Sequence, residues 1–245
     1  TIVHDEDLMS ADYFRDDEVP AEAPAEAAPA PAPETIDKLL SVAEYHGIEA
    51  AIIIGKNELD GEKAAELERI YTLAGYSVFS LSCATGDGIE RLEKFVSTAL
   101  VGKIAAFAGA SGVGKSTLMS RLFPALALET GEISRRTERG KHTTRTAELF
   151  PISLGGGEAF LADTPGFSLV DFENFDFLPF SALPSTMREF APYLGKCQYD
   201  DCTHTKDQGC AVLRAVEAGE IAPSRHESYL SMYRILKAKK SWEKK

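Results

Sequence analysis

The sequence lacks long apolar runs and an export signal. Among its 245 residues no run of about 18 apolar side chains occurs, which excludes an ordinary membrane-spanning helix. The first residues, 1–7, have neither the positive flank nor the apolar stretch of a secretory signal. We therefore expect a cytoplasmic protein with no membrane partner. With 44% hydrophobic and 26% charged residues, the chain can bury one good core plus an appendage.

Cysteine is scarce, and its placement is uneven. Three of the four cysteines, Cys197, Cys202 and Cys210, crowd into one short stretch, while Cys83 stands alone. Such spacing is a poor disulfide framework, but it is typical of metal ligands in a reducing compartment. A metal site is the first interpretation.

Positive charge is also limited, because the formal net charge is −12. Residues 1–34 hold ten acidic side chains and one arginine, so most of this charge lies there. Their Ala/Pro/Glu tract, 20–34, cannot form a continuous helix and has little apolar bulk, so we expect 1–34 to be a mobile acidic arm. The last twelve residues are basic and remain a candidate contact for RNA or phosphate.

From residue 35 the pattern becomes globular and alternates between helix and strand. The apolar spacing predicts helices over 35–46, 61–74, 88–100 and from 115, and strands over 50–54, 77–81 and 103–108. This alternation indicates an α/β fold, a mostly parallel sheet with helices on both faces, over 35–172. Strand signals then fade, and 211–240 reads as largely helical around the Cys/His cluster. We therefore expect a small helical, metal-binding domain at 173–245.

A phosphate-binding loop follows the strand at 103–108. The pattern G-x-x-x-x-G-K-[ST] is met at 109–116, after a strand and at the start of a helix, which is the context that the motif requires. Successive backbone N–H groups would face phosphate oxygens, and Lys115 would supply a cation to the β/γ phosphates. The predicted nucleotide-binding residues here are Gly109, Ala110, Ser111, Gly112, Val113, Gly114, Lys115, Ser116 and Thr117.

A second motif, some fifty residues later, makes this a triphosphate site. An apolar strand ends in Asp163-Thr-Pro-Gly166, where Asp163 would reach the Mg²⁺ shell and the Gly166 amide would sense the γ-phosphate. The Ser116 hydroxyl would bind Mg²⁺ directly. Between the two motifs lies a polar stretch, 135–146, in which a switch loop is expected. Thr143 and Thr144 are its candidate Mg²⁺ ligands.

A base-reading element is expected after these motifs, but its counterpart lies before them. Strand 50–54 leads into 55–60, and strand 77–81 leads into 82–88, which resembles the loop that backs the base through Ser82 and Cys83. The order is therefore base-reading, base-backing, phosphate loop, switch and Asp-x-x-Gly. This order is a circular permutation.

With this order and the cysteine spacing, the chain resembles the RsgA (YjeQ) family of circularly permuted GTPases over about 35–245. Cys197, Cys202, His204 and Cys210 have the C-x4-C-x-H-x5-C spacing of that family's zinc site. Three thiolates and one imidazole form a closed set, so the zinc would be structural, one per chain. The resemblance implies a GTP hydrolase with Mg²⁺ that binds GTP and GDP and acts in small-subunit maturation through the ribosomal subunit and its rRNA. We expect a monomer.

Three departures from the family pattern stand out. The base-reading residues aligned by their strand are Gly55, Lys56, Asn57 and Glu58, with Gly for the usual Asn, whose side chain ties the loops together, and Glu for the usual Asp. Reading Asn57-x-x-Asp60 instead restores Asn and Asp, two residues further from the strand. The arm, 1–34, cannot build the family's N-terminal β-barrel, and it offers no good candidate for the strand that precedes helix 35–46.

The third departure is Phe167, which stands where many GTPases have Gln and cannot orient the attacking water. Intrinsic hydrolysis should therefore be slow, and the resemblance suggests His142 as a catalytic residue beside Lys115. Two alternatives stay open. One is a nucleotide-binding scaffold with little turnover, and the other is a P-loop ATPase with relaxed base selectivity.

Overall fold

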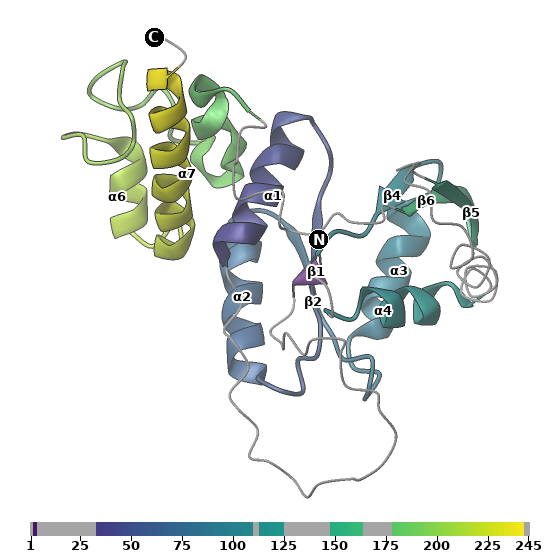
Figure 1. Ribbon diagram of the computed structural model, residues 1–245. Helices are drawn as coiled ribbons and strands as arrows, with labels where there is room; N and C mark the ends of the chain where they lie inside the picture. Colours follow the sequence, from purple (N-terminus) through teal and green to yellow (C-terminus); the bar gives the residue numbers. More distant parts are fainter. Residues whose placement is uncertain (1, 4–32, 110–112, 125–147, 164–177, 243–245) are drawn as a thin grey trace, which may run out of the picture.

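The computed structural model describes residues 2–3, 33–109, 113–124, 148–163 and 178–242. Figure 1 shows three groups of elements side by side: the C-terminal helices, a central group around α1, α2 and β2, and a group around β4, β5 and β6. None of the helices in these described stretches is long and apolar enough to cross a bilayer.

The central group is a three-stranded parallel sheet. Its strands are β1 (Ile2–Val3), β2 (Ala51–Ile54) and β3 (Ser77–Ser80), in that order. The helices that connect or follow them are α1 (Pro33–Tyr45), α2 (Gly61–Leu73) and α3 (Ile89–Ala99).

Alternation along β2 shows that both faces of this sheet are covered. Ile53 packs into one core together with Leu92 of α3, while Ile52 packs into a second core together with Leu40 of α1 and Leu67 of α2. Successive side chains of a strand point to opposite faces, so a run of isoleucine is what a strand covered on both sides requires. The predicted layers are confirmed here.

The second group holds the phosphate-loop strand. It consists of β4 (Ile104–Ala106), α4 (Lys115–Leu122), β5 (Glu148–Leu154) and β6 (Gly157–Asp163). β6 lies between β4, to which it is parallel, and β5, with which it forms an antiparallel hairpin. Side chains of β5 and β6 share the first core with α3, α4 and β3, so the two sheets form one α/β body. Three of the four strand pairings are parallel, as expected, although the described strands form two sheets and β5 had no predicted counterpart.

The C-terminal part is helical, as predicted for 211–240. It contains the 3₁₀ segments η2 (Phe180–Thr186) and η3 (Arg188–Phe190), and the α-helices α6 (Ala211–Glu217) and α7 (Pro223–Trp242). Its own core includes Phe190, Val212 and Tyr229. α7 and η2 both pack on α1, which lies between this part and the sheet in Figure 1.

Two expectations about the N-terminal arm were wrong. Ile2–Val3 forms the strand thought to be missing, and it pairs in parallel with Ile53 and Ile54 of β2. A strand of two residues gives no periodicity to detect in a sequence. In addition, α1 begins at Pro33 rather than at Thr35, because proline fits the first helical turn, where its missing N–H costs nothing.

Candidate nucleotide and metal sites

The register of the strands brings the expected nucleotide motifs to common sheet edges. In the second sheet Ala106 pairs with Ala162, so the turn after β4 and the end of β6 at Asp163 lie at one edge. In the first sheet Ile54 pairs with Ser80, which places the turns after β2 and β3 together as well. Ligands of open parallel sheets bind at the carboxyl ends of the strands.

Lys115 lies at the start of α4, beside the phosphate loop. Gly114, with φ 90°, turns the chain into the helix, and the Lys115 Nζ donates to the Gly109 carbonyl at 2.9 Å. The lysine ammonium thus contacts the first residue of the predicted loop. Burial lowers the pKa of Lys115, because its ammonium is partly withdrawn from water. An anion placed in the loop would offset this cost.

Part of the predicted triphosphate site lies within the described residues. Val113 is buried in the first core, whereas Ser116 and Thr117 are exposed on the first turn of α4. The backbone of Asp163 ends β6 beside this region. The other predicted residues of this site, Ala110, Ser111, Gly112, His142, Thr143, Thr144 and Gly166, lie outside the described residues.

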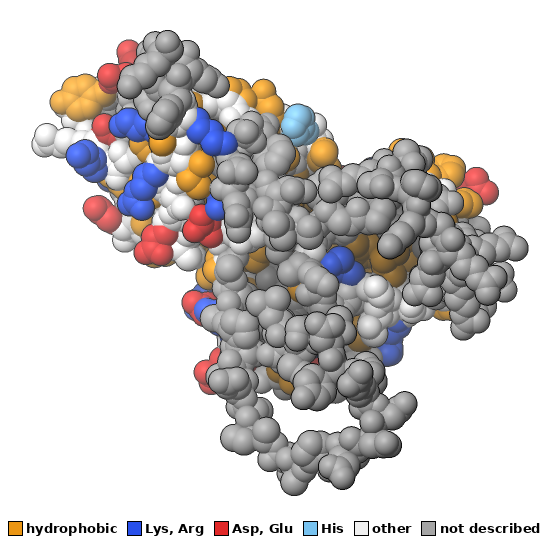
Figure 2. Space-filling model, in the orientation of Figure 1, with side chains coloured by type: hydrophobic (Ala, Val, Ile, Leu, Met, Phe, Trp, Pro, Cys, Tyr) orange, Lys and Arg blue, Asp and Glu red, His pale blue; other side chains and the backbone are white. Residues whose placement is uncertain are grey.

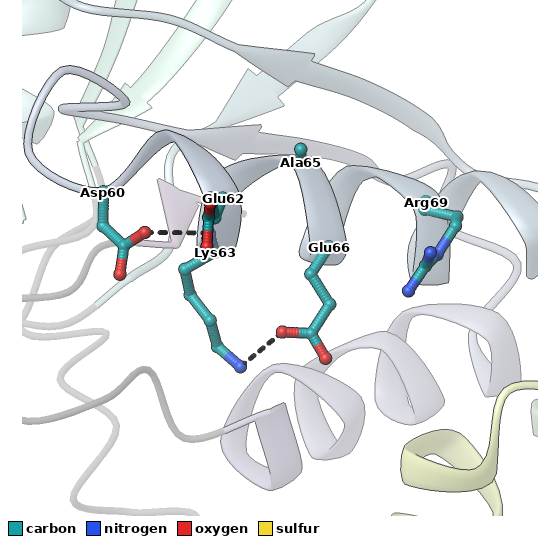
Figure 3. A pocket seen from close by; sticks show the side chains of 6 residues that line it. All are labelled: Asp60, Glu62, Lys63, Ala65, Glu66 and Arg69. Atoms are coloured by element: carbon teal, nitrogen blue, oxygen red, sulfur yellow. Dashed lines mark hydrogen bonds and ion pairs between the residues drawn. The ribbon is translucent and has the colours of Figure 1, made fainter.

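The loop after β2 contains two carboxylates that could read the base, Glu58 and Asp60, and the contacts of Asp60 are described by the structure. Asp60 caps α2, since its carboxylate accepts a hydrogen bond from the Lys63 backbone N–H at 2.9 Å. Figure 3 shows this carboxylate directed at the start of the helix, in an open hollow lined by Asp60 and residues of α2. Asp60 is therefore committed to the helix, and Glu58 is the carboxylate left in the loop.

Backbone strain marks two of the predicted sites. Among the described residues other than glycine, only Lys56 (φ 53°) and His204 (φ 57°) have positive φ. Such conformations are costly for residues with a side chain and cluster at functional sites. Lys56 lies in the base-reading loop and His204 in the expected metal site.

The loop after β3 is a turn closed by its own hydrogen bonds. Ser82 is fully buried, its Oγ accepts from the Thr85 N–H at 3.0 Å, and its backbone N–H donates to the Asp87 carbonyl at 3.0 Å. Gly88, with φ 69°, follows, and a Cβ there would lie 2.2 Å from the Ser80 carbonyl oxygen. The buried Ser82 shapes this turn, and only glycine fits at 88.

A hydrogen bond brings the base-side loop and the phosphate side together. Arg121, near the end of α4, donates from Nη1 to the Cys83 carbonyl at 2.8 Å. Burial raises the pKa of the Cys83 thiol, the Arg121 charge opposes this increase, and the Glu58 carboxylate adds to it. No pattern in the sequence pointed to Arg121, since a basic residue at a helix end is usually only solvated.

The four expected metal ligands converge in the C-terminal part. Their ligand atoms all lie within 4.8 Å of one another. The His204 Nδ1 is 3.6 Å from the Cys197 and Cys202 sulfurs and 3.5 Å from the Cys210 sulfur, and the Cys197 and Cys210 sulfurs are 3.9 Å apart. A tetrahedron with metal–sulfur bonds of about 2.3 Å and metal–nitrogen bonds of about 2.0–2.1 Å has edges of about 3.8 and 3.6 Å. The donor set fits a tetrahedral metal ion.

Backbone N–H groups face two of these sulfurs, while burial disfavours the charged thiolate without a metal. The Ala211 N–H points at the Cys197 sulfur at 3.3 Å, and the Leu213 N–H points at the Cys210 sulfur at 3.4 Å. Burial, together with the neighbouring sulfurs, raises the pKa of Cys202 to about 12, so a bound cation would have to displace a proton there.

Two side chains of α7 contact backbone carbonyls in the loop of the predicted metal ligands. The His226 Nε2 lies 2.8 Å from the His204 carbonyl oxygen, and the Tyr229 hydroxyl donates to the Thr203 carbonyl at 2.7 Å. The metal site is therefore fixed to the helix that packs on α1.

Comparison with known proteins now identifies the family. The sequence profile of the RsgA GTPase family matches residues 25–173, more than half of the chain. The chain belongs to the RsgA GTPase family. The fold is accordingly that of a circularly permuted GTPase with a helical C-terminal part that carries a Cys₃His cluster.

Individual RsgA relatives cover most of the chain. The small ribosomal subunit biogenesis GTPase RsgA of Ruminiclostridium cellulolyticum is 41% identical over 86% of this chain and 67% of its own length. That of Moorella thermoacetica is 40% identical over 83% of this chain and 67% of its own length. This chain therefore spans about two thirds of the length of these RsgA proteins.

Two solved structures of circularly permuted GTPases resemble the chain. YjeQ from Thermotoga maritima matches with a TM-score of 0.65 and 35% identity, over 84% of this chain and 66% of YjeQ. YloQ, described as a circularly permuted GTPase, matches with a TM-score of 0.61 and 26% identity, over 85% of this chain and 64% of YloQ.

Proposed function

We propose that the chain hydrolyses GTP to GDP and phosphate in the biogenesis of the small ribosomal subunit. The observation that carries this proposal is the contact of Arg121 with Cys83, because it joins the helix after the phosphate loop to the loop that backs the base. The names of the RsgA relatives, small ribosomal subunit biogenesis GTPases, supply the cellular process.

On the phosphate side, Lys115 would hold the β/γ phosphates through its ammonium, which contacts the Gly109 carbonyl at the start of the predicted loop. Mg²⁺ would neutralise charge on the phosphates, and Ser116 and Asp163 are its proposed holders. Their support is the exposure of Ser116 on the first turn of α4 and the position of Asp163 at the end of β6. Thr143 or Thr144 as a further Mg²⁺ ligand, Gly166 as the γ-phosphate contact and His142 as the catalytic residue follow from the family pattern.

On the base side, Glu58 is the proposed reader of the guanine N1–H and N2–H groups. Its support is that Asp60 is engaged as a helix cap and that the Glu58 carboxylate acts electrostatically on the Cys83 thiol, raising its pKa. Glutamate is one methylene longer than the usual aspartate, and Gly55 has no side chain to brace the loop. Guanine affinity should therefore be lower than with an Asn-Lys-x-Asp loop.

The Cys₃His cluster would hold one structural zinc ion. All four ligand positions are taken by protein side chains, which excludes the open position that a catalytic zinc keeps for water or substrate. Zinc would fix the loop 197–210 against α6 and α7.

The rRNA contact would involve the C-terminal helices. Arg234 and Lys237 are exposed one turn apart on α7, and the Lys237 ammonium lies 5.3 Å from the centre of the Tyr233 ring. Figure 2 shows other Lys and Arg side chains over this part, mixed with acidic ones. We further propose action as a monomer in the cytoplasm, where ribosomal subunits mature. The proposed division is an acidic segment within 1–34, which contributes β1 and the first residues of α1 to the sheet domain, a GTPase domain at 35–172 and a zinc domain at 173–245.

The test is nucleotide hydrolysis with GTP and with ATP, each with and without small ribosomal subunits. We expect slow turnover of GTP that the subunits accelerate, little turnover of ATP, and loss of activity in Lys115→Ala. Equal hydrolysis of ATP and GTP without a response to subunits would identify an ATPase instead. Tight GDP binding without turnover under either condition would identify a nucleotide-binding scaffold.

A further inference from the structure

One side-chain hydrogen bond joins the two base-side loops directly. The Asn57 Nδ2 donates to the Asp87 Oδ2 at 2.8 Å. The Asn57 backbone N–H also donates to the Leu81 carbonyl at 3.1 Å, so this residue contacts the second loop through both its backbone and its side chain.

The local backbone explains why Asn57 can reach across. The positive φ of Lys56 reverses the chain after β2, and the Leu59 N–H closes the turn on the Lys56 carbonyl at 3.0 Å. This turn presents Asn57 to the neighbouring loop, while Asp60, a few residues on, anchors α2.

Asp87 is held as firmly from its own side. Its carbonyl accepts from the Ser82 N–H at 3.0 Å, and its N–H donates to the Thr85 Oγ1 at 3.3 Å. Gly88, where no Cβ fits, follows directly. The Asp87 carboxylate therefore extends from a turn that is fixed at both ends, and it offers Asn57 a stationary acceptor.

The Asn57–Asp87 pair joins two loops that Gly55, having no side chain, cannot join. In the family pattern an asparagine at position 55 ties these loops together, but glycine stands there and has no side chain. We propose that Asn57 and Asp87 are a positioning pair that sets the spacing between the base-reading and base-backing loops and thereby controls affinity and selectivity for guanine. The inference rests on the proposed function, and neither side chain needs to touch the nucleotide.

Asn57 is a poor candidate for reading the base itself. Its amide N–H is used by Asp87, whereas the N1–H and N2–H groups of guanine need two acceptor oxygens on one side chain. Glu58 has a carboxylate with both. The pair acts through Glu58 and Cys83, because it holds the loops that carry them.

The experiment is calorimetric titration of the zinc-loaded full chain with GDP and with ADP. Asn57→Ala and Asp87→Ala should each raise the Kd for GDP about five- to tenfold, the loss expected for one solvent-exposed hydrogen bond. The double variant should lose no more than either single one, because both changes break the same contact. The preference for GDP over ADP should fall, while kcat at saturating GTP stays within about twofold.

Exchanging the side chains at positions 57 and 87 tests whether GDP binding can be rescued. Asn57→Asp alone places two carboxylates against each other and should bind GDP worst, whereas Asn57→Asp combined with Asp87→Asn reverses donor and acceptor and should restore the wild-type Kd. Lys63→Ala is the matched control, because it breaks an exposed contact of the same length, 2.8 Å to Glu66, in the neighbouring helix. It should leave the Kd unchanged.

The outcomes separate this inference from the proposed function. If the wild-type chain binds no guanine nucleotide, the proposed function fails and this inference fails with it. If the wild type binds GDP but both alanine variants bind equally well and keep its selectivity, the positioning role alone is refuted. Loss of binding without rescue by the reversed pair would also refute it, since the bond would not be what matters.

Discussion

Replacing Arg225 with methionine is expected to destabilise the protein severely. Arg225 of α7 is 1% exposed and donates to both carboxylate oxygens of Glu189, at 2.7 and 3.1 Å, and to Asp37 of α1. The Tyr71 hydroxyl of α2 also donates to Asp37, at 3.0 Å. The network thus joins α1 and α2 of the α/β body to η3 and α7 of the C-terminal part.

The expected loss of folding stability follows from the buried carboxylates that Arg225→Met leaves without a cation. Asp37 is 0% exposed and its Oδ2 has no hydrogen-bond partner, so without Arg225 two carboxylates remain in the interior with no cation. Removing one partner of a buried ion pair costs about 3–5 kcal/mol. In a domain of this size each kcal/mol lowers the Tm by roughly 2–4 °C.

The assay is urea unfolding of the zinc-loaded chain, followed by circular dichroism. The matched control is Arg91→Met, whose partner Glu68 is 3.2 Å away and whose side chain is 65% exposed. It should cost less than about 1 kcal/mol. A triple variant with Arg225→Met, Asp37→Asn and Glu189→Gln should recover part of the loss, because no unpaired charge stays buried. An Arg225→Met protein as stable as the Arg91→Met control would refute the reasoning.

The folding stability of Arg225→Met should depend on pH in a defined direction. Burial raises the pKa of Asp37, whereas the Arg225 charge opposes that increase, so losing Arg225 should raise the pKa further. A carboxyl whose pKa is higher in the folded than in the unfolded protein favours folding at low pH, where it is protonated. This contribution to folding stability is lost as the pH rises through the folded pKa. The stability deficit of Arg225→Met relative to wild type should therefore shrink from pH 8 to pH 5. A deficit that grows on acidification would contradict this account.

Three further predictions concern the sites themselves. Lys115→Ala should abolish measurable GTP and GDP binding in calorimetry while leaving the circular dichroism spectrum unchanged. Glu58→Asp should lower the Kd for GDP several-fold, whereas Glu58→Gln, which loses an acceptor for guanine, should raise it about tenfold or more; equal GDP affinity of both variants would exclude Glu58 as the base reader. Metal analysis should find about one zinc per chain, and Cys202→Ser should lose the ion and lower the Tm; a metal-free wild type with an intact C-terminal part would refute the zinc site.

Much of the fold was predictable because its elements are long and periodic. Helices 61–73 and 89–99 and strand 51–54 lie within a residue or so of their predicted bounds. β1 was missed because two residues carry no pattern, and Ile2–Val3 becomes a strand only by pairing with β2. β5 was missed because Glu148–Leu154 has a proline at its centre, which a hairpin with one free edge tolerates.

The metal ligands and the phosphate loop could be named in advance because their chemistry lies in local spacing. Asp87, Arg121 and Arg225 could not, because each acts on a partner distant in sequence: Asn57, Cys83 and Asp37. An exposed aspartate or a helix arginine looks the same in sequence whether it is solvated or bonded.

The sequence without the fold was sufficient for the order of the motifs, the Cys₃His cluster and the family resemblance, because these depend on residue type and on distance along the chain. The structure alone showed that Asp60 caps the first turn of α2, which leaves Glu58 as the proposed base reader, since a capping contact exists only once the helix has formed. The structure also revealed that Asn57 bonds to Asp87 between the loops that follow two neighbouring parallel strands, and that Arg225 joins the two parts of the molecule. These contacts form between segments that meet only when the chain is folded, so no local pattern encodes them.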